Sequence, residues 1–275
     1  LVGSEMCIRD RNAQWSHNRY RIYYPKTMGD AVWSMYDYNR GCCDNICYSG
    51  VADIFRLPKF SLSFFRTQIA EGSMLPSGKM PYEVFIPAYR DEILSDTVMV
   101  YGNVDEVELV LNGKTIRRQT ADKGPDSDYI SVPNGGNGKN LHFPPFTFYG
   151  VPKERGVLKA VGYHQGKKVA EYTVKTPGVP ERLDITYFES GKPATKNDLL
   201  IVYVRMLDKQ GVLCPVNGIP VELSVQGGEI VGPTSYPLEA GVASFLVRTG
   251  EISKININAT GKGFSTRKSL KVGKE

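Results

Sequence analysis

The residues best suited to chemistry lie in one short stretch near the start of the chain. Within eight positions it holds Trp33, Tyr36, Asp37, Tyr38, Asn39 and Arg40. Sugars present a flat apolar face ringed by hydroxyls, and a site for them combines an aromatic platform with carboxylate, amide and guanidinium partners. In a second interpretation Trp33 and Tyr36 belong to a hydrophobic core, and Asp37 and Arg40 form a local ion pair. The residue types alone favour neither the sugar site nor the core interpretation.

Other catalytic patterns are missing from the sequence. The three histidines, His17, His142 and His164, stand near no Gly-x-Ser-x-Gly elbow, because the chain contains none. A phosphate-binding glycine loop and a His-Glu-x-x-His pair are also lacking. Residues 135–138 are rich in glycine but read as a flexible loop. We therefore expect no nucleophile set of the Ser-His-Asp kind, and no cofactor.

The five cysteines do not build a metal site. Cys43 and Cys47 are separated by three residues, but no second pair follows to complete four zinc ligands. The number of cysteines is odd and too small for a disulfide framework. We expect no metal, and a local disulfide among Cys42, Cys43 and Cys47 stays open.

The charge and hydropathy of the chain exclude two classes of partner. The net charge is +5 over 275 residues, and Lys and Arg are spread along the chain, as at 117–118 and 167–168. A nucleic-acid surface would need these charges clustered on one motif. No apolar run approaches the roughly 20 residues that span a bilayer. We expect neither nucleic-acid binding nor a membrane span.

One β/α unit should position the Trp33 stretch. Residues 12–24 are typical of the end of a helix, 30–37 of a short buried strand, and 38–49 of a loop. Pro58 opens a second helix, since its missing N–H would be unpaired at a first helical position. A single unit of this size cannot bury its own apolar faces. It should belong to something larger, with the polar and aromatic cluster at the carboxyl end of the strand.

The rest of the chain predicts two antiparallel β domains. Residues 71–82 are punctuated by Gly, Pro and Ser and predict a linker. Within 83–176, Asn112-Gly113 lies between two alternating runs, which is a strong hairpin signal. A second hairpin is expected around Gln165-Gly166. In 178–275, evenly spaced short strands predict an immunoglobulin-like sandwich; they fall at 182–188, 199–207, 221–225, 242–247, 255–259 and 268–272.

The first eleven residues read differently from the rest. Residues 1–11 lack the basic start and long apolar core of a signal peptide. They resemble a translated sequencing-adapter tail of the kind found at the ends of environmental gene fragments. We expect the true reading to start near Asn12 in a chain that is truncated there, with any targeting signal upstream of it.

Several motifs resemble glycoside hydrolase family 2, the family of β-galactosidases, β-glucuronidases and β-mannosidases. Residues 29–41 (GDAVWSMYDYNRG) resemble the eighth strand of its catalytic (β/α)8 TIM barrel and the loop that follows. Residues 49–59 and 64–68 are similar to the helix after that strand. The middle block resembles a sandwich that follows the barrel, through 101–109, 112–114, 144–148 and 158–163. The last block looks like the immunoglobulin-like domain that often closes such chains.

The resemblance implies a mostly β chain with two sandwiches after the last β/α unit of the barrel. It implies a barrel end at 12–70, a linker at 71–82, and sandwich domains at 83–176 and 178–275. Both catalytic glutamates of the family precede the eighth strand, so this chain should lack them and be inactive alone. Trp33 should lie near the sugar, with Asp37, Asn39 and Arg40 as further substrate-binding residues that shape the loop.

The implied function is that of a retaining exo-glycosidase acting on β-linked sugars in carbohydrate catabolism, first of all a β-galactosidase. The expected partner is a β-linked oligosaccharide or glycoside, a homo-oligomer is compatible with the family, and the location is the periplasm or the extracellular space. An alternative is a non-catalytic carbohydrate-binding or structural protein. In it, Tyr129, Phe143, Phe146, Phe148 and Tyr149 would form an exposed aromatic face. In the structural interpretation, these aromatics instead pack inside the sandwich or dock on the barrel.

Overall fold

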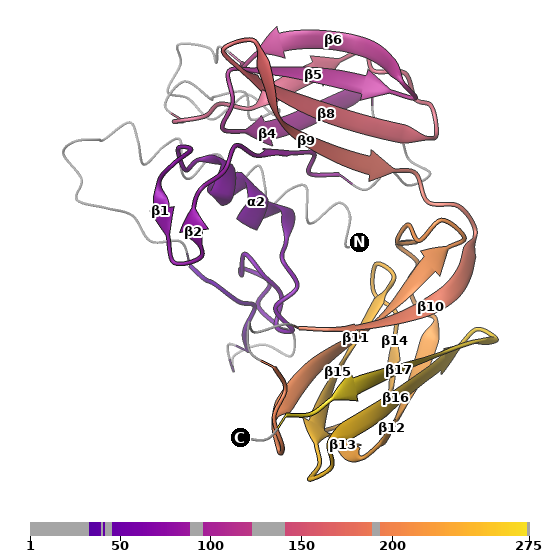
Figure 1. Ribbon diagram of the computed structural model, residues 1–275. Helices are drawn as coiled ribbons and strands as arrows, with labels where there is room; N and C mark the ends of the chain where they lie inside the picture. Colours follow the sequence, from indigo (N-terminus) through magenta and orange to yellow (C-terminus); the bar gives the residue numbers. More distant parts are fainter. Residues whose placement is uncertain are drawn as a thin grey trace. The chain divides into compact units, whose positions relative to one another are not determined.

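The computed structural model describes residues 33–39, 41, 46–88, 96–122, 141–188 and 193–273. By its internal contacts the chain forms two compact units, Leu1–Thr176 and Pro177–Glu275, and each is described by itself. Across the described residues there are 17 strands and a single α-helix (Figure 1). The chain is therefore mostly β, as the sequence predicts. No helix within the described residues is long and apolar enough to cross a membrane.

The described residues between 33 and 59 form paired loops rather than regular strands. Tyr36 and Ala52 make an isolated parallel bridge, and Tyr38 and Cys47 make an antiparallel one. The strand predicted at 30–37 was expected to be buried, but Trp33 is 75% exposed and Met35 64% exposed. For its described part this prediction was wrong, and its first three residues lie outside the described range. The described residues offer this segment a neighbour in 47–52, whereas a buried strand has neighbours on both sides.

The predicted second helix is present as α2 (Phe60–Thr67), which begins two residues after Pro58. It buries Ser61, Phe64 and Thr67, which lie on one face because residues three apart are neighbours on a helix. The N–H of Gln68 closes the helix by donating to the Phe65 carbonyl at 3.2 Å.

The segment expected to be a linker contains a small hairpin. Strands β1 (Met74–Leu75) and β2 (Gly78–Lys79) pair antiparallel. Met80 is 1% exposed, so its side chain anchors the end of the hairpin. Its N–H donates to the Ser73 carbonyl at 2.8 Å. The Gly and Pro residues that suggested a linker instead form the turns of an ordered segment.

Two sheets form the sandwich of the first unit. The smaller has the order β3 (Val84–Phe85), β4 (Thr97–Gly102), β7 (Phe146–Tyr149). The larger has the order β6 (Lys114–Thr120), β5 (Glu106–Leu111), β8 (Val157–His164), β9 (Lys167–Lys175). Both predicted hairpins are confirmed: Asn112 and Gly113 have φ of 51° and 80°, and Gln165 and Gly166 have φ of 50° and 76°. Positive φ at both central residues is what a tight two-residue hairpin requires.

The alternation of β5 determines which face of the larger sheet is buried. Val107, Leu109 and Leu111 point into the core, while Glu106 and Glu108 point outward. Their core neighbours include Phe146 and Phe148 from the smaller sheet, both fully buried. Period-two alternation of this kind is the expected signature of a half-buried strand.

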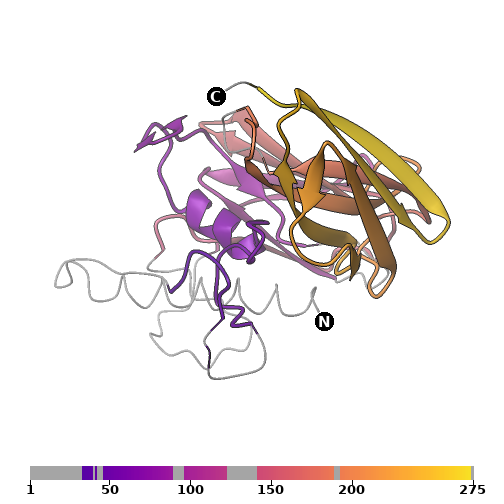
Figure 2. The same cartoon turned by 90° about the horizontal axis from the view of Figure 1, so that it is seen from below.

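Helix α2 packs on the sandwich. Phe64, Tyr101 and Leu141 form one buried cluster, and the rings of Phe64 and Tyr101 lie 5.2 Å apart edge to face. The helix contacts β3 and β4. It lies beside the sandwich of the first unit in Figures 1 and 2. An aromatic pair in this geometry contributes about 0.5–1.5 kcal/mol beyond its buried area.

Polar contacts hold the same junction. The side-chain amide of Gln68 donates to the Phe143 carbonyl at 2.8 Å and accepts from its N–H at 3.2 Å. Asn103 donates to the carbonyls of Ile69 and Pro81, at 3.1 and 2.9 Å. Arg66 and Glu83 form a two-pronged ion pair. The helix and the sandwich therefore share a buried cluster and several specific hydrogen bonds.

The second unit is a β-sandwich of two four-stranded antiparallel sheets. One has the order β10 (Pro180–Tyr187), β11 (Leu199–Asp208), β15 (Val242–Thr249), β13 (Gly228–Ile230). The other has the order β14 (Ser235–Pro237), β12 (Pro220–Gln226), β16 (Lys254–Gly261), β17 (Phe264–Lys271). Six of these strands were predicted, with β17 beginning four residues earlier than expected. The short β13 and β14 were not.

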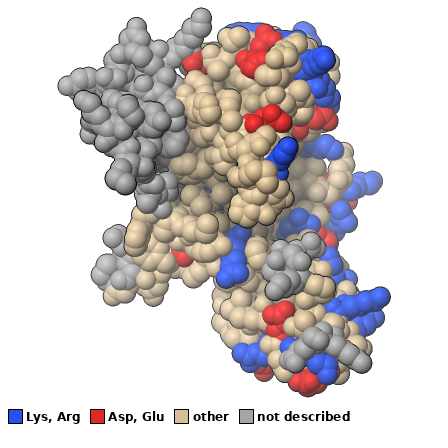
Figure 3. Space-filling view, turned by 60° about the vertical axis from the view of Figure 1, so that its left-hand side comes forward, with Lys and Arg blue, Asp and Glu red and all other residues tan. Residues whose placement is uncertain are grey.

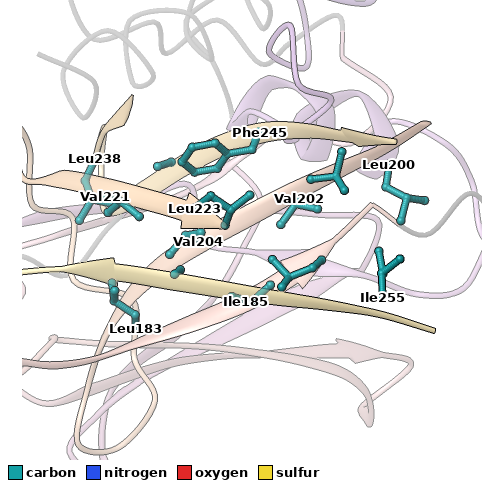
Figure 4. Close-up of a cluster of buried hydrophobic side chains, with 14 of the residues drawn as sticks. Leu183, Ile185, Leu200, Val202, Val204, Val221, Leu223, Leu238, Phe245 and Ile255 are labelled. Atoms are coloured by element: carbon teal, nitrogen blue, oxygen red, sulfur yellow. The ribbon is translucent and has the colours of Figure 1, made fainter. Parts of the chain in front are cut away.

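The core of the second unit is mostly aliphatic and includes the buried ring of Phe245. Leu183, Ile185, Val202, Val204 and Phe245 are among the side chains that the two sheets enclose (Figure 4). They alternate with less buried residues along their strands, as in β15. This unit buries its own core, as an independent domain must.

Candidate functional site: the Trp33 platform

The Trp33 segment is held by backbone pairing to the segment at 47–52. The N–H of Val51 donates to the Ser34 carbonyl at 3.1 Å, and the N–H of Ala52 to the Met35 carbonyl at 3.0 Å. Farther along, Tyr38 exchanges two backbone hydrogen bonds with Cys47, at 2.9 and 3.3 Å. These bonds fix the register of the two segments.

Trp33, which is exposed, and Tyr38, which is half-buried, form an aromatic platform. The Trp33 indole Nε1–H donates to the Tyr38 hydroxyl oxygen at 2.7 Å. Their rings lie 6.1 Å apart at 77°. The peptide bond between Trp33 and Ser34 is cis. Since the polar atom of Trp33 is already bonded, its exposed surface offers chiefly a flat apolar face, which suits the apolar face of a sugar ring.

Asp37 precedes Tyr38 in the chain and is 5% exposed. Its Oδ1 accepts from the N–H of Gly50 at 2.9 Å and from Lys59 Nζ at 2.5 Å. The sequence predicted Asp37 as a substrate-binding residue that shapes the loop. Its burial and partners fit the shaping of the loop, and the contact with substrate stays a prediction.

Gly50 allows the two segments to approach. A Cβ atom at this position would lie 2.3 Å from the backbone N of Asp37 and 2.3 Å from the carbonyl carbon of Tyr36. Real Cβ contacts do not reach this distance, so residue 50 must be glycine for Asp37 to bond to its N–H. The reason for glycine here is close backbone approach.

Asp53 is the second carboxylate of this region. Its Oδ1 accepts from the N–H of Leu57 at 2.7 Å, which closes the turn before α2. Burial raises the pKa of Asp53, and the nearby carboxylate of Asp37 acts in the same direction. Hydrogen bonds from the backbone N–H groups of Leu57 and Phe55 lower this pKa in part, as does the charge of Lys59. A partly buried carboxyl of this kind favours the protonated form.

The other predicted site residues have different outcomes. Asn39 is exposed, and its Oδ1 accepts from the N–H of Gly41 at 2.8 Å, so its side chain shapes the turn. Arg40, Cys42 and Cys43 lie outside the described residues. The Cys47 Sγ lies 3.3 Å from the Ser49 hydroxyl oxygen.

Sequence reasoning missed three residues of the site. Lys59 and Gly50 were grouped with the helix motif, and Tyr48 with the loop, although Lys59 Nζ contacts both Asp37 and the Tyr48 carbonyl. The N–H of Lys59 also donates to the Val51 carbonyl at 3.0 Å. The available signal was a lone lysine immediately before an apolar helix face, which is too common to identify a site.

The aromatic residues of the sandwich mostly pack inside it. Phe146 and Phe148 are fully buried, and the backbone of Phe143 is bonded to Gln68. Tyr149 is 57% exposed. Tyr129 lies outside the described residues. The described aromatics therefore agree with the interpretation in which they pack inside the sandwich, with Tyr149 as the exception.

The charges on one face of the molecule are mixed in sign. On the face shown in Figure 3, Lys and Arg side chains are interspersed with Asp and Glu. Many are paired, for example Arg118 with Glu106 and Lys168 with Glu171. A nucleic-acid site would require a continuous basic stripe.

Comparison with known proteins gives these features a context. A family described as "Domain of unknown function (DUF4982)" matches residues 95–170. A β-galactosidase of Thermoanaerobacter pseudethanolicus is 32% identical over 82% of this chain and 30% of its own length. A β-galactosidase of Rhizobium radiobacter is 30% identical over 46% of this chain and 92% of its own length.

Solved structures agree on the fold. A β-glucuronidase from glycoside hydrolase family 2 superposes with a TM-score of 0.70 and 20% identity, over 95% of this chain and 28% of that chain. The fold and the comparisons together define a chain of the β-glycosidase class. It belongs to glycoside hydrolase family 2. The chain spans about a third of the length of the first relatives it matches.

Proposed function

We propose that this chain is the C-terminal part of a retaining exo-glycosidase that hydrolyses β-glycosidic bonds in carbohydrate catabolism, with β-galactosides as the first candidate substrates. The observation that carries the proposal is the similarity to β-galactosidases, one of which is 32% identical over 82% of the chain. The exposed Trp33 platform supports it, because a flat apolar face is what a sugar ring stacks on.

In this proposal residues 12–70 close a catalytic (β/α)8 barrel, 71–82 connect it to a sandwich at 83–176, and 178–275 form an immunoglobulin-like domain. The active site of such a barrel lies at the carboxyl ends of its strands. Trp33 would stack on the sugar there. Asp37 and Asn39 would hold the loop that carries Trp33, and Arg40 would belong to the same loop.

The proposed reaction is a double displacement. A carboxylic acid protonates the leaving oxygen, and a second carboxylate attacks the anomeric carbon to form a covalent glycosyl-enzyme. Water then hydrolyses that intermediate, with the first carboxyl acting as base. We place both carboxylates in the part of the relatives' length that this chain does not span. The chain alone would then bind a sugar face without cleaving the bond.

Further proposals concern the context of the enzyme. We place it in the periplasm or outside the cell, where β-linked oligosaccharides are met, with a homo-oligomer compatible with this role. The second unit would act as a structural domain, since its described surface presents no cluster comparable to the Trp33 platform. Carbohydrate binding by the sandwich alone has less support, because Phe146 and Phe148 are buried.

The test begins with the complete gene recovered from the source DNA. The encoded enzyme is assayed against nitrophenyl β-galactoside, β-glucuronide, β-mannoside and β-glucoside. We expect hydrolysis of one of them and a loss of about 10- to 100-fold in kcat/KM for Trp33→Ala, the range expected when a large apolar contact is removed.

Tyr149→Ala is the matched control, because it removes another exposed aromatic ring of the same unit. It should leave kcat/KM unchanged. A complete gene without an upstream barrel, or a Trp33→Ala variant as active as the parent, would overturn the proposal.

A further inference from the structure

A buried cation lies where three segments of the Trp33 region meet. Lys59 precedes α2, and its side chain is 11% exposed. Its Nζ donates to Asp37 Oδ1 at 2.5 Å and to the Tyr48 carbonyl at 3.2 Å. One ammonium group therefore bridges the helix start, the segment that carries Trp33 and the segment at 47–52.

Both charged side chains of this bridge are largely shielded from water. The side chain of Asp37 is 3% exposed, so both charges of the pair are largely buried. Surface ion pairs contribute little, but a buried pair depends on both partners, because loss of one leaves an uncompensated charge. The pair is thus suited to specify one arrangement of the segments that it joins.

The bridge reaches the platform through a short chain of contacts. Asp37 is followed by Tyr38, whose backbone is bonded to Cys47 and whose hydroxyl accepts from the Trp33 indole. The N–H of Asp37 also donates to the Ala52 carbonyl at 3.1 Å. A displacement of Asp37 would therefore move the ring that orients Trp33.

We propose that Lys59 is a positioning residue: its buried ion pair with Asp37 holds the Trp33 and Tyr38 rings in the orientation that receives the sugar. The proposal rests on the proposed function, in which Trp33 contacts the substrate. Lys59 itself touches no substrate. It acts because a displacement of about 1 Å in a positioned group can reduce turnover about 100-fold.

The first experiment uses the 275-residue chain with Trp15→Phe, which leaves Trp33 as its single tryptophan. Lys59→Met removes the charge and keeps most of the side-chain volume, whereas Lys59→Arg keeps the charge. In Lys59→Met we expect a shifted, faster-exchanging Trp33 indole N–H resonance and stronger iodide quenching of its fluorescence. Lys59→Arg should stay close to the parent. A parent-like Trp33 signal in Lys59→Met overturns the proposal.

The double variant Asp37→Asn with Lys59→Met covers the case in which Lys59→Met fails to fold. It removes both charges, so no uncompensated buried charge remains. The bridge is still absent in it, and Trp33 should remain displaced. If the double variant restores the parental Trp33 signal, the positioning role is wrong.

The second experiment measures kcat and KM in the complete enzyme. We expect Lys59→Met to lower kcat/KM by about 100-fold with a substantial part of the loss in kcat, and Lys59→Arg to recover most of it. Lys196→Met, which removes an exposed cation paired with Glu251 in the other unit, should have no effect.

The two proposals fail separately in this experiment. If Trp33→Ala retains full activity, the proposed function is wrong. If Trp33→Ala loses activity while Lys59→Met keeps the parental kcat and KM, Trp33 remains at the sugar and only the role of Lys59 is wrong.

Discussion

At the scale of single residues, the geometry around Asp37 depends on the missing side chain of Gly50 and on the charge of Lys59. Gly50 lacks a side chain, and this lets its N–H reach the Asp37 carboxylate at 2.9 Å. Lys59 carries the charge that balances that carboxylate. Asp53 stands close enough for the charge of Asp37 to affect its pKa. Substitutions at these positions should therefore alter the Trp33 region more than the sandwich beside it.

Gly50→Ala should destabilise the region, because the added Cβ would lie 2.3 Å from backbone atoms that cannot rotate away. We expect a loss of about 1–3 kcal/mol in the free energy of unfolding, as for overpacked sites. Urea denaturation followed by Trp33 fluorescence, with Trp15→Phe in the parent and in each variant, measures it. Gly273→Ala is the control, since a Cβ there would lie 3.6 Å from its nearest neighbour. Equal stability of the two variants would contradict the close approach at Gly50.

Asp53→Asn should become increasingly stabilising as pH rises. Burial raises the pKa of Asp53 in the folded state, so the folded state holds this proton more tightly than the unfolded chain does. The parent protein therefore loses stability from this group as pH rises through the folded-state pKa. Asparagine does not titrate, and its Oδ1 can still accept from the N–H of Leu57.

The free energies of unfolding of the parent and of Asp53→Asn are to be compared between about pH 3 and about pH 7. The difference in favour of asparagine should grow with pH across this interval. A difference that shrinks would mean that the hydrogen bonds to the carboxylate outweigh its burial.

At the scale of elements, helix α2 is the part that connects the Trp33 region to the sandwich. Its buried face meets Tyr101 of β4, and Gln68 just after it binds the backbone of Phe143. The helix has eight residues, and isolated helices of this length are marginal in water. Its stability must come from this packing.

Phe64→Ala should loosen α2 from the sandwich. Phe64 is fully buried, and truncation of such a ring typically costs about 3–5 kcal/mol. We expect faster proteolysis within residues 57–70 and a lower urea midpoint. Ser63→Ala changes a half-buried residue of the same helix and serves as the control. A cost below about 1 kcal/mol for Phe64→Ala would show that the cluster does not hold the helix.

Elements with a clear pattern could be predicted from the sequence, and those without one could not. The β5–β6 hairpin follows from alternating residues around Asn112-Gly113, and it is present as expected. The strands β13 and β14 have three residues each, too few to show a period. In the site, the aromatic cluster around Trp33 was visible in sequence. The Lys59–Asp37 pair was not, because its partners are 22 positions apart and meet only through loop folding.

At the scale of the whole molecule, the chain contains two units with separate cores. The second unit, Pro177–Glu275, encloses its own cluster of mostly aliphatic side chains, which includes Phe245. A domain of about 100 residues with its own core is expected to fold alone.

Residues 177–275 expressed alone should therefore unfold cooperatively, with a free energy of unfolding of about 5–15 kcal/mol. Calorimetry tests this by comparing the calorimetric and van't Hoff enthalpies, which should agree for a two-state domain. Val204→Ala is the matching core variant and should lower the midpoint of this fragment. A fragment without a cooperative transition would contradict the assignment of a separate core.

The junction of α2 with the sandwich has a consequence for recombination within the family. Gln68, Asn103 and the Phe64–Tyr101 pair bind residues on both sides of the hairpin at 74–79. In a chimera joined inside that hairpin, the two partners of each contact would come from different parents. The glycine- and proline-rich segment nevertheless resembles a linker at which chains could be joined. A crossover near residue 177, where one compact unit ends, leaves every one of these contacts within a single parent. Exchange of sandwiches between relatives should therefore succeed when the helix travels with its sandwich.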